Sequence, residues 1–197
     1  GGVFIRQSQA MIFFQRTTAV FLASWVLTSS GVQAQQCVSN NQDLESLVQT
    51  ADEAYTNRDV QGVQDGVSAI RTHLDCLSEV LATDRAAELY EVLAKDAFLR
   101  RMSNESVGFF RALQEVRPGY SPDFADSRHP LVRLFNEAQQ IEIGESDLLS
   151  PPPGTHFWID GRKSITRPSH RPAIFQLLSG DNAVLWTGLL MAGEVLP

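Results

Sequence analysis

A run of prolines divides the chain into two parts whose apolar residues follow different periods. Residues 150–154 read Ser-Pro-Pro-Pro-Gly. Three consecutive prolines are incompatible with the interior of a helix and favour a stiff, extended segment. From 43 to 141 apolar residues recur at the three- and four-residue spacing of amphipathic helices, whereas from 156 to 190 short apolar runs alternate with turn sequences. We therefore predict an α+β fold that is mainly helical and ends in a small antiparallel β-hairpin subdomain.

The helical part predicts five helices, each with one apolar face. The expected N-caps, short polar residues that bind free backbone N–H groups, are Asp43 or Asn41, Thr83 or Asp84, and Asp126 or Ser127. The positions expected to face the core are Leu44, Leu47, Val48, Ala51, Ala54, Tyr55, Val60, Val63, Val67, Ile70, Leu74, Leu77, Leu89, Leu93, Ala94, Ala97, Phe98, Val107, Phe110, Leu113, Val116, Leu131, Leu134, Phe135 and Ala138.

Residues 87–120 resemble a degenerate tetratricopeptide (TPR) unit. The positions that match the motif are Tyr90, Leu93, Ala94, Phe110 and Pro118. The chain departs from the motif at Ser106, where the family usually has Ala, and at Leu113, which replaces the second small residue. The resemblance implies antiparallel helix hairpins, stacked so that their concave face forms a ligand groove. A generic antiparallel bundle is the alternative.

The segment 150–197 resembles the PEGA-type domain of exported bacterial proteins. The matching elements are Pro153-Gly154, the strand into Trp158-Ile159-Asp160-Gly161, Arg167-Pro168 and the hydrophobic strands that follow; the Glu of the name motif is absent. Asp160-Gly161 is also a strong signal for a two-residue hairpin turn. We expect four strands, near 156–159, 163–167, 174–178 and 183–190. The resemblance implies an envelope-associated binding module without chemistry of its own.

The first 34 residues contain no Asp or Glu and read as a secretory leader. Met11 opens a short basic region, an apolar stretch follows at 19–27, and small residues lead to Ala34, the pattern of a signal peptide with its cleavage site. We treat residues 1–10 as upstream of the leader and expect residues 1–34 to be removed. An uncleaved anchor and a lipid anchor are alternatives. The order of leader, TPR-like helices and β tail resembles envelope proteins of Gram-negative bacteria, which implies a periplasmic or outer-envelope location.

Export would place the two cysteines, Cys37 and Cys76, in an oxidising compartment. A bridge between them would close a loop of about 40 residues, with a stabilisation of roughly 4 kcal/mol in the chain-entropy model. The alternative is a redox pair or a metal site. The chain has no CxxC motif and no nearby His/Cys cluster, so we predict a structural disulfide.

The charge distribution excludes some partners and suggests one. The net charge of −7 argues against a nucleic-acid partner, which needs a basic face, and no apolar run beyond the leader is long enough for a membrane span. Within this acidic chain, one ten-residue stretch is basic, and its members are Arg162, Lys163, Arg167, His170 and Arg171. They would either keep an edge strand soluble or bind an anionic partner: an acidic glycan, a lipid headgroup or an acidic protein patch. Trp158 and Trp186 on neighbouring strands would pack in the core or present an aromatic binding surface.

The sequence holds no motif of a common enzyme class. GxSxG, GxGxxG, Walker A and HExxH are all absent, so we predict no catalytic residue, metal or cofactor. We predict an exported, non-enzymatic interaction or scaffold protein of the bacterial envelope. It would bind a protein or an anionic envelope component through the helical groove or the β tail. One alternative is an envelope hydrolase with Asp126, His129 and Glu137 in a site between the helices and the tail. Another is a subunit of an envelope assembly.

Overall fold

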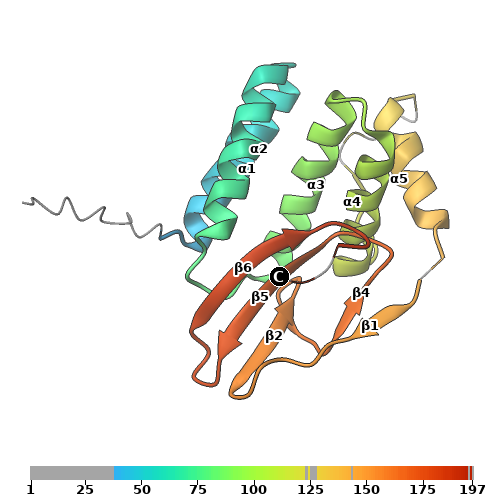
Figure 1. Cartoon of the computed structure of the whole chain (residues 1–197). Helices are drawn as coiled ribbons and strands as arrows, with labels where there is room; N and C mark the ends of the chain where they lie inside the picture. Colours follow the sequence, from blue (N-terminus) through green and yellow to red (C-terminus); the bar gives the residue numbers. More distant parts are fainter. Residues whose placement is uncertain (1–37, 123, 125–127, 143, 195, 197) are drawn as a thin grey trace, which may run out of the picture. The chain divides into compact units, whose positions relative to one another are not determined.

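The computed structural model describes residues 38–122, 124, 128–142, 144–194 and 196. The described part forms five helices followed by short strands in two small antiparallel sheets, with the helices above the larger sheet in Figure 1. This confirms the predicted α+β, mainly helical fold. The expected leader, residues 1–34, lies outside the described residues.

Helices α1 (Asn41–Thr56) and α2 (Val60–Asp75) form the first hairpin. The N-cap of α1 is Asn40, one residue before the predicted candidate Asn41 and three before Asp43. Its side chain accepts hydrogen bonds from the N–H groups of Gln42 and Asp43, and the Asp43 carboxylate accepts one from the Asn40 N–H. This reciprocal capping box explains why Asp43 stood out in the sequence although it is not the cap itself.

Helices α3 (Thr83–Leu99) and α4 (Ser103–Val116) form the second hairpin. They lie close together because Ser106 is small, and its buried hydroxyl donates to the Ala94 carbonyl at 2.9 Å. The predicted caps of α3 are wrong: its N-cap is Ala82, which makes no side-chain bond. The Thr83 hydroxyl donates instead to the carbonyl of Gly161, 3.3 Å away in a turn of the sheet.

Helix α5 (Pro130–Gln140) is capped by His129, whose Nδ1 accepts a hydrogen bond from the Leu131 N–H at 3.2 Å. Proline at the first helical position has its φ already set for the helix and lacks an N–H that would otherwise stay unpaired. The predicted caps Asp126 and Ser127 lie outside the described residues.

The five helices share one apolar core, which confirms most of the predicted core positions. Leu47, Ala54, Tyr55 and Phe98 are partly buried at its margin. Val60 is the exception, at 45% exposed, because it is the first residue of α2 and faces solvent.

The larger sheet has the strand order β3-β2-β5-β6 and is antiparallel throughout. Its strands are β2 (Thr155–Ile159), β3 (Arg162–Lys163), β5 (Ala173–Ser179) and β6 (Val184–Leu190). Asp160 and Gly161 connect β2 to β3 with φ values of 52° and 79°. Positive φ at both positions is typical of a type I′ turn, so the predicted hairpin is confirmed.

The smaller sheet pairs β1 (Ser146–Leu148) with β4 (Thr166–Pro168), and we call it the β1–β4 ribbon. The single return strand predicted at 163–167 is wrong, because the chain bends between β3 and β4. Ser164 holds this bend, since its hydroxyl oxygen accepts the Thr166 N–H at 3.1 Å. Strand β1 precedes the proline run, so β structure begins before the predicted boundary at residue 150.

The larger sheet is covered on both faces. On the helix side, Ile174 joins the helical core, and Gln176 accepts the Leu81 N–H at 2.7 Å and donates to the Glu79 carbonyl at 2.9 Å. The opposite face carries a second apolar cluster of Phe157, Ile159, Ala173, Phe175 and Leu190. Residues 36–197 accordingly form one compact unit, in which the β part shares its core with the helices.

None of the helices in the described ranges is long and apolar enough to cross a bilayer.

Candidate functional site

The five basic residues predicted as a binding cluster do not form one surface. Arg167 and Arg171 are buried, at 5% and 6% exposed. The His170 side chain is also largely covered, at 12% exposed. Arg162 and Lys163 are both exposed. The basic stretch therefore supplies both internal contacts and charge that faces solvent.

Arg167 fixes the end of the chain onto the sheet. Its guanidinium lies 5.7 Å from the centre of the Phe175 ring and donates to the carbonyls of Met191, at 3.0 Å, and Glu194. A cation over an aromatic face is attracted by the ring quadrupole. Arg167 is thus occupied by contacts within the chain.

Arg171 joins the sheet to α4. Its Nη1 donates to Asp160 Oδ2 at 2.8 Å, and its Nε donates to Glu115 Oε2 at 2.6 Å. Burial acts to lower the pKa of the guanidinium, but the two carboxylates raise it above its ordinary value. A buried charge is tolerated when it is paired in this way.

Tyr90 extends the same network into α3. Its hydroxyl donates to Asp160 Oδ1 and accepts the Ile174 N–H at 2.9 Å. Burial raises the pKa of the phenol well above its ordinary value, and the Asp160 carboxylate raises it further. The phenol therefore stays protonated and acts as a hydrogen-bond donor.

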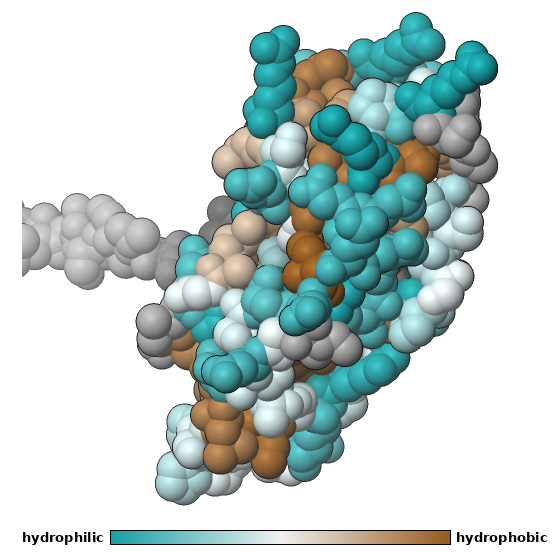
Figure 2. All heavy atoms as spheres, turned by 90° about the vertical axis from the view of Figure 1, so that its right-hand side faces the viewer, coloured by the Kyte–Doolittle hydropathy of each residue, from teal (hydrophilic) through white to brown (hydrophobic). Residues whose placement is uncertain are grey.

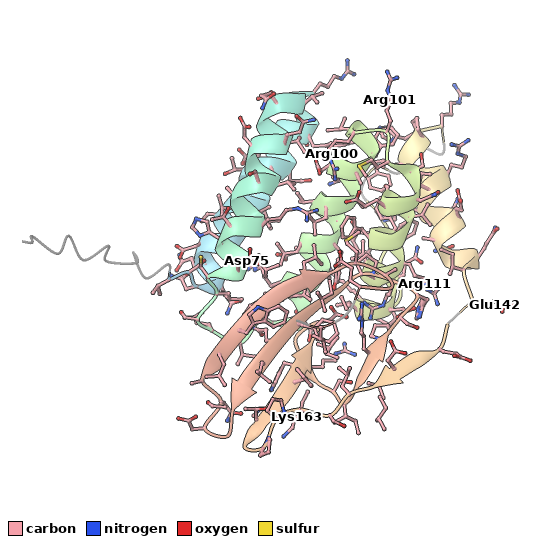
Figure 3. The ribbon with its side chains drawn as sticks, in the orientation of Figure 1. Asp75, Arg100, Arg101, Arg111, Glu142 and Lys163 are labelled. Carbon is pink, nitrogen blue, oxygen red and sulfur yellow. The ribbon has the colours of Figure 1, made fainter. Side chains whose placement is uncertain are left out.

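Glu115 on α4 collects three basic groups. Besides its bond with Arg171, Glu115 accepts a hydrogen bond from His170 Nε2 at 2.8 Å. Arg111 forms an ion pair with it: the Arg111 Nε lies 2.8 Å from Glu115 Oε1, but the N–H does not point at this oxygen, so the contact is not a hydrogen bond. Figure 3 shows Arg111 in the half of α4 that is nearer the sheet. Burial acts to raise the pKa of Glu115, but the hydrogen bonds from His170 and Arg171 lower it below its ordinary value.

We call Tyr90, Asp160, Arg171, Glu115 and His170 the inter-layer network. Sequence reasoning included two of its members as candidate binders and missed the other three. The sequence does contain one indication that Glu115 faces the interior, because this acid lies between Leu113 and Val116, two apolar residues that are buried. Both carboxylates are engaged by internal cations, so the network joins the helices to the sheet.

A polar hollow of about 320 Å³ opens beside this network, and we call it the basic cleft. It lies between the end of α4, the β2–β3 hairpin and the β1–β4 ribbon, and its cations are Arg162, Lys163 and Arg171. The Arg162 guanidinium donates to the Val116 carbonyl at 3.3 Å, which leaves its charge uncompensated. The Lys163 amine makes no hydrogen bond or ion pair within the described ranges, and Figure 3 shows this residue at the sheet end of the molecule.

The two tryptophans do not stack on one another. Trp158 pairs with Gln176 and Trp186 with Leu177, which are successive residues of β5 and so point to opposite faces. Trp158 is half-buried and its indole N–H has no partner in the described part of the chain. It does not line the basic cleft.

A larger hollow, of about 630 Å³, lies on the helical side between α1, α2 and α3. At its wall the buried Lys95 bonds to Asp52 and to Glu91, at 2.8 Å from the latter, and lies over the Tyr55 ring at 5.4 Å. Burial acts to lower the pKa of Lys95, but these carboxylates raise it above its ordinary value. Lys95 thereby joins the first hairpin to the second.

Of the alternative hydrolase site, the described part of the chain shows His129 and Glu137, which line different hollows. Asp126 lies outside the described residues. His129 lines the helical hollow and uses Nδ1 to cap α5, whereas Glu137 is exposed and lines a different hollow on α5. The described part of the chain holds no group of three His, Cys, Asp or Glu placed to bind a metal ion.

Cys76 is disulfide-bonded. Its predicted partner Cys37 lies outside the described residues, so the pairing stays a prediction. The neighbouring residues favour it, because the Ser39 N–H donates to the Cys76 carbonyl at 3.0 Å and Ser39 pairs with Leu77 in a parallel bridge.

Comparison with known proteins adds no relative: no family model, curated protein or solved structure matches the chain.

Proposed function

We propose that the chain is an exported, non-enzymatic interaction protein of the bacterial envelope, which binds an anionic partner at the basic cleft. The observation that carries the proposal is the uncompensated pair Arg162 and Lys163 in a chain of net charge −7. The two acids of the cleft, Glu115 and Asp160, pair with the buried cations Arg171 and Arg111, so they do not neutralise Arg162 and Lys163. A local surplus of positive charge attracts anions even on an acidic protein.

A binding role, rather than a catalytic one, also agrees with the hydrogen bonds and ion pairs that already occupy the acidic and histidine side chains. A general base or nucleophile needs an unoccupied atom that a substrate can reach. In the inter-layer network Tyr90, Asp160 and Arg171 are buried, and Arg171 binds both carboxylates, Asp160 and the partly covered Glu115. His129 uses one ring nitrogen to cap a helix.

The proposal is tested by chromatography of the chain on immobilised heparin, a polyanion without lipid, with elution by a salt gradient. We expect retention at low salt and, for the double variant R162E/K163E, elution at clearly lower salt. The matched control is Arg133→Glu, an exposed cation on α5 away from the cleft. Absence of retention for the unmodified chain, or an equal loss in R133E and R162E/K163E, would contradict the proposal.

A further inference from the structure

The tip of the β1–β4 ribbon exposes two aliphatic side chains beside the basic cleft. Leu148 is 74% exposed and Ile165 is 59% exposed, among the highest values for large apolar residues in the described ranges. They are diagonal neighbours at the end of the ribbon, because Leu148 pairs with Thr166 and the Leu149 N–H donates to the Ile165 carbonyl at 2.8 Å. Successive residues of a strand alternate between its two sides, so both side chains meet one surface only when the tip enters that surface end-on. Figure 2 shows apolar atoms gathered at the lower end of one face of the molecule, bordered by hydrophilic ones.

The cations of the basic cleft adjoin this tip. Lys163 lies two positions before Ile165, and Arg162 precedes it. The acid of β1, Asp147, is opposite Arg167 in the ribbon, and its side chain alternates to the other face from Leu148. Beside the two aliphatic side chains, Lys163 and Arg162 outnumber the exposed Asp147, which leaves a surplus of one positive charge at the tip.

We propose that the anionic partner is a lipid surface, into which Leu148 and Ile165 insert while Lys163 and Arg162 meet the headgroup phosphates. The proposal rests on the proposed function and names its partner. An acidic glycan would engage the cations alone and leave both aliphatic side chains in water. A bilayer with anionic lipid offers phosphates at its surface and hydrocarbon just below, so it engages both kinds of side chain.

The expected contributions are separable. Each cation near an anionic leaflet strengthens binding by about fivefold, and this part weakens with salt. Insertion of two aliphatic side chains adds roughly a hundredfold when both are fully buried and less for a shallow tip, and this part is insensitive to salt. The membrane contact is thus weak and reversible.

The test is flotation of the chain with vesicles of phosphatidylcholine alone and with vesicles of equal parts phosphatidylcholine and phosphatidylglycerol. We expect the chain to float with the anionic vesicles only. The variant L148S/I165S should lose at least about tenfold in vesicle affinity and keep its retention on heparin. Leu185→Ser is the control, since Leu185 is 56% exposed on β6, at the other edge of the sheet, and should float as the unmodified chain does.

The possible failures are distinguishable. Retention on heparin without flotation would overturn the lipid surface and leave the proposed function standing. Flotation of L148S/I165S at the unmodified level would show that the aliphatic tip is not the contact. Loss of both heparin retention and flotation in the unmodified chain would overturn both proposals. Equal melting temperatures of the variants would show that each loss arises at the surface.

Discussion

Tyr90 on α3 and Asp160 in the β2–β3 turn lie seventy positions apart in sequence and share a buried hydrogen bond. Asp160 also accepts from Arg171 and from the Ile174 N–H, so this one carboxylate connects a helix, a turn and a strand. The stability of the two-layer arrangement should depend on it more than on any exposed acid.

We predict that Asp160→Ala costs about 3–5 kcal/mol of unfolding free energy, because it leaves Arg171 buried with one partner fewer. Tyr90→Phe should cost less, about 1.5–3 kcal/mol, since it removes one hydrogen bond to a charged carboxylate. The Ile174 N–H keeps Asp160 Oδ1 as its acceptor in this variant. Urea unfolding measures both values. Asp65→Ala on the exposed side of α2 is the control, and a cost for Asp160→Ala as small as that of the control would contradict the role assigned to the network.

The β2–β3 turn gives a second prediction, based on two glycines with similar backbone angles. A Cβ on Gly161, at φ 79°, would lie 2.5 Å from the backbone nitrogen of Thr83, whereas a Cβ on Gly154, at φ 77°, would meet nothing within 4 Å. Gly154→Ala should therefore cost about 1 kcal/mol for the strained backbone alone. Gly161→Ala should cost clearly more, because α3 must move away from the turn. Thermal melts of the two variants compare them directly, and similar melting temperatures would argue against tight contact between the turn and α3.

The hydrogen bonds to Glu115 predict a pH dependence at acid pH. Its pKa is lower in the folded chain than the ordinary 4.5, so the folded state binds fewer protons than the unfolded state. The stabilisation is therefore present above pH 4.5 and is lost as the pH falls through the lowered folded value. Unfolding free energies measured across this range should fall less steeply for Glu115→Gln than for the unmodified chain. Glu137→Gln, an exposed change on α5, should leave the slope unchanged.

Reduction should lower the melting temperature noticeably if Cys37 and Cys76 are bridged. The loop of about 40 residues corresponds to roughly 4 kcal/mol in the chain-entropy model. A calorimetric scan with and without reductant measures the shift. The variant C37S should melt like the reduced chain and be insensitive to reductant, and an unchanged melting temperature on reduction would speak against the bridge.

The parts of the fold that could be predicted are those determined by residues close together in the sequence. Helix α5 follows from Leu131, Leu134, Phe135 and Ala138 on one face, because their spacing alone defines an amphipathic helix. The turn at Asp160-Gly161 was predictable because both residue types tolerate positive φ.

The parts that were missed depend on residues distant in sequence. Strand β1 has three exposed residues without alternation and exists because β4 offers it an edge. A buried arginine such as Arg171 has no sequence mark that separates it from the exposed Lys163. Its partners Asp160 and Glu115 come from different layers, so the inter-layer network becomes visible only once the layers are packed.

The side chain of Gln176 has a consequence for how the chain reaches this fold. Its amide substitutes for a peptide group, since it pairs with the backbone of Glu79 and Leu81, the latter 95 positions earlier. During synthesis the connection between α2 and α3 therefore emerges long before the strand that completes its hydrogen bonds. Closing so long a loop is entropically slow. The helices can form early, but their junction should acquire native protection from hydrogen exchange only when β5 arrives, so the last third of the chain sets the time at which the first half becomes rigid.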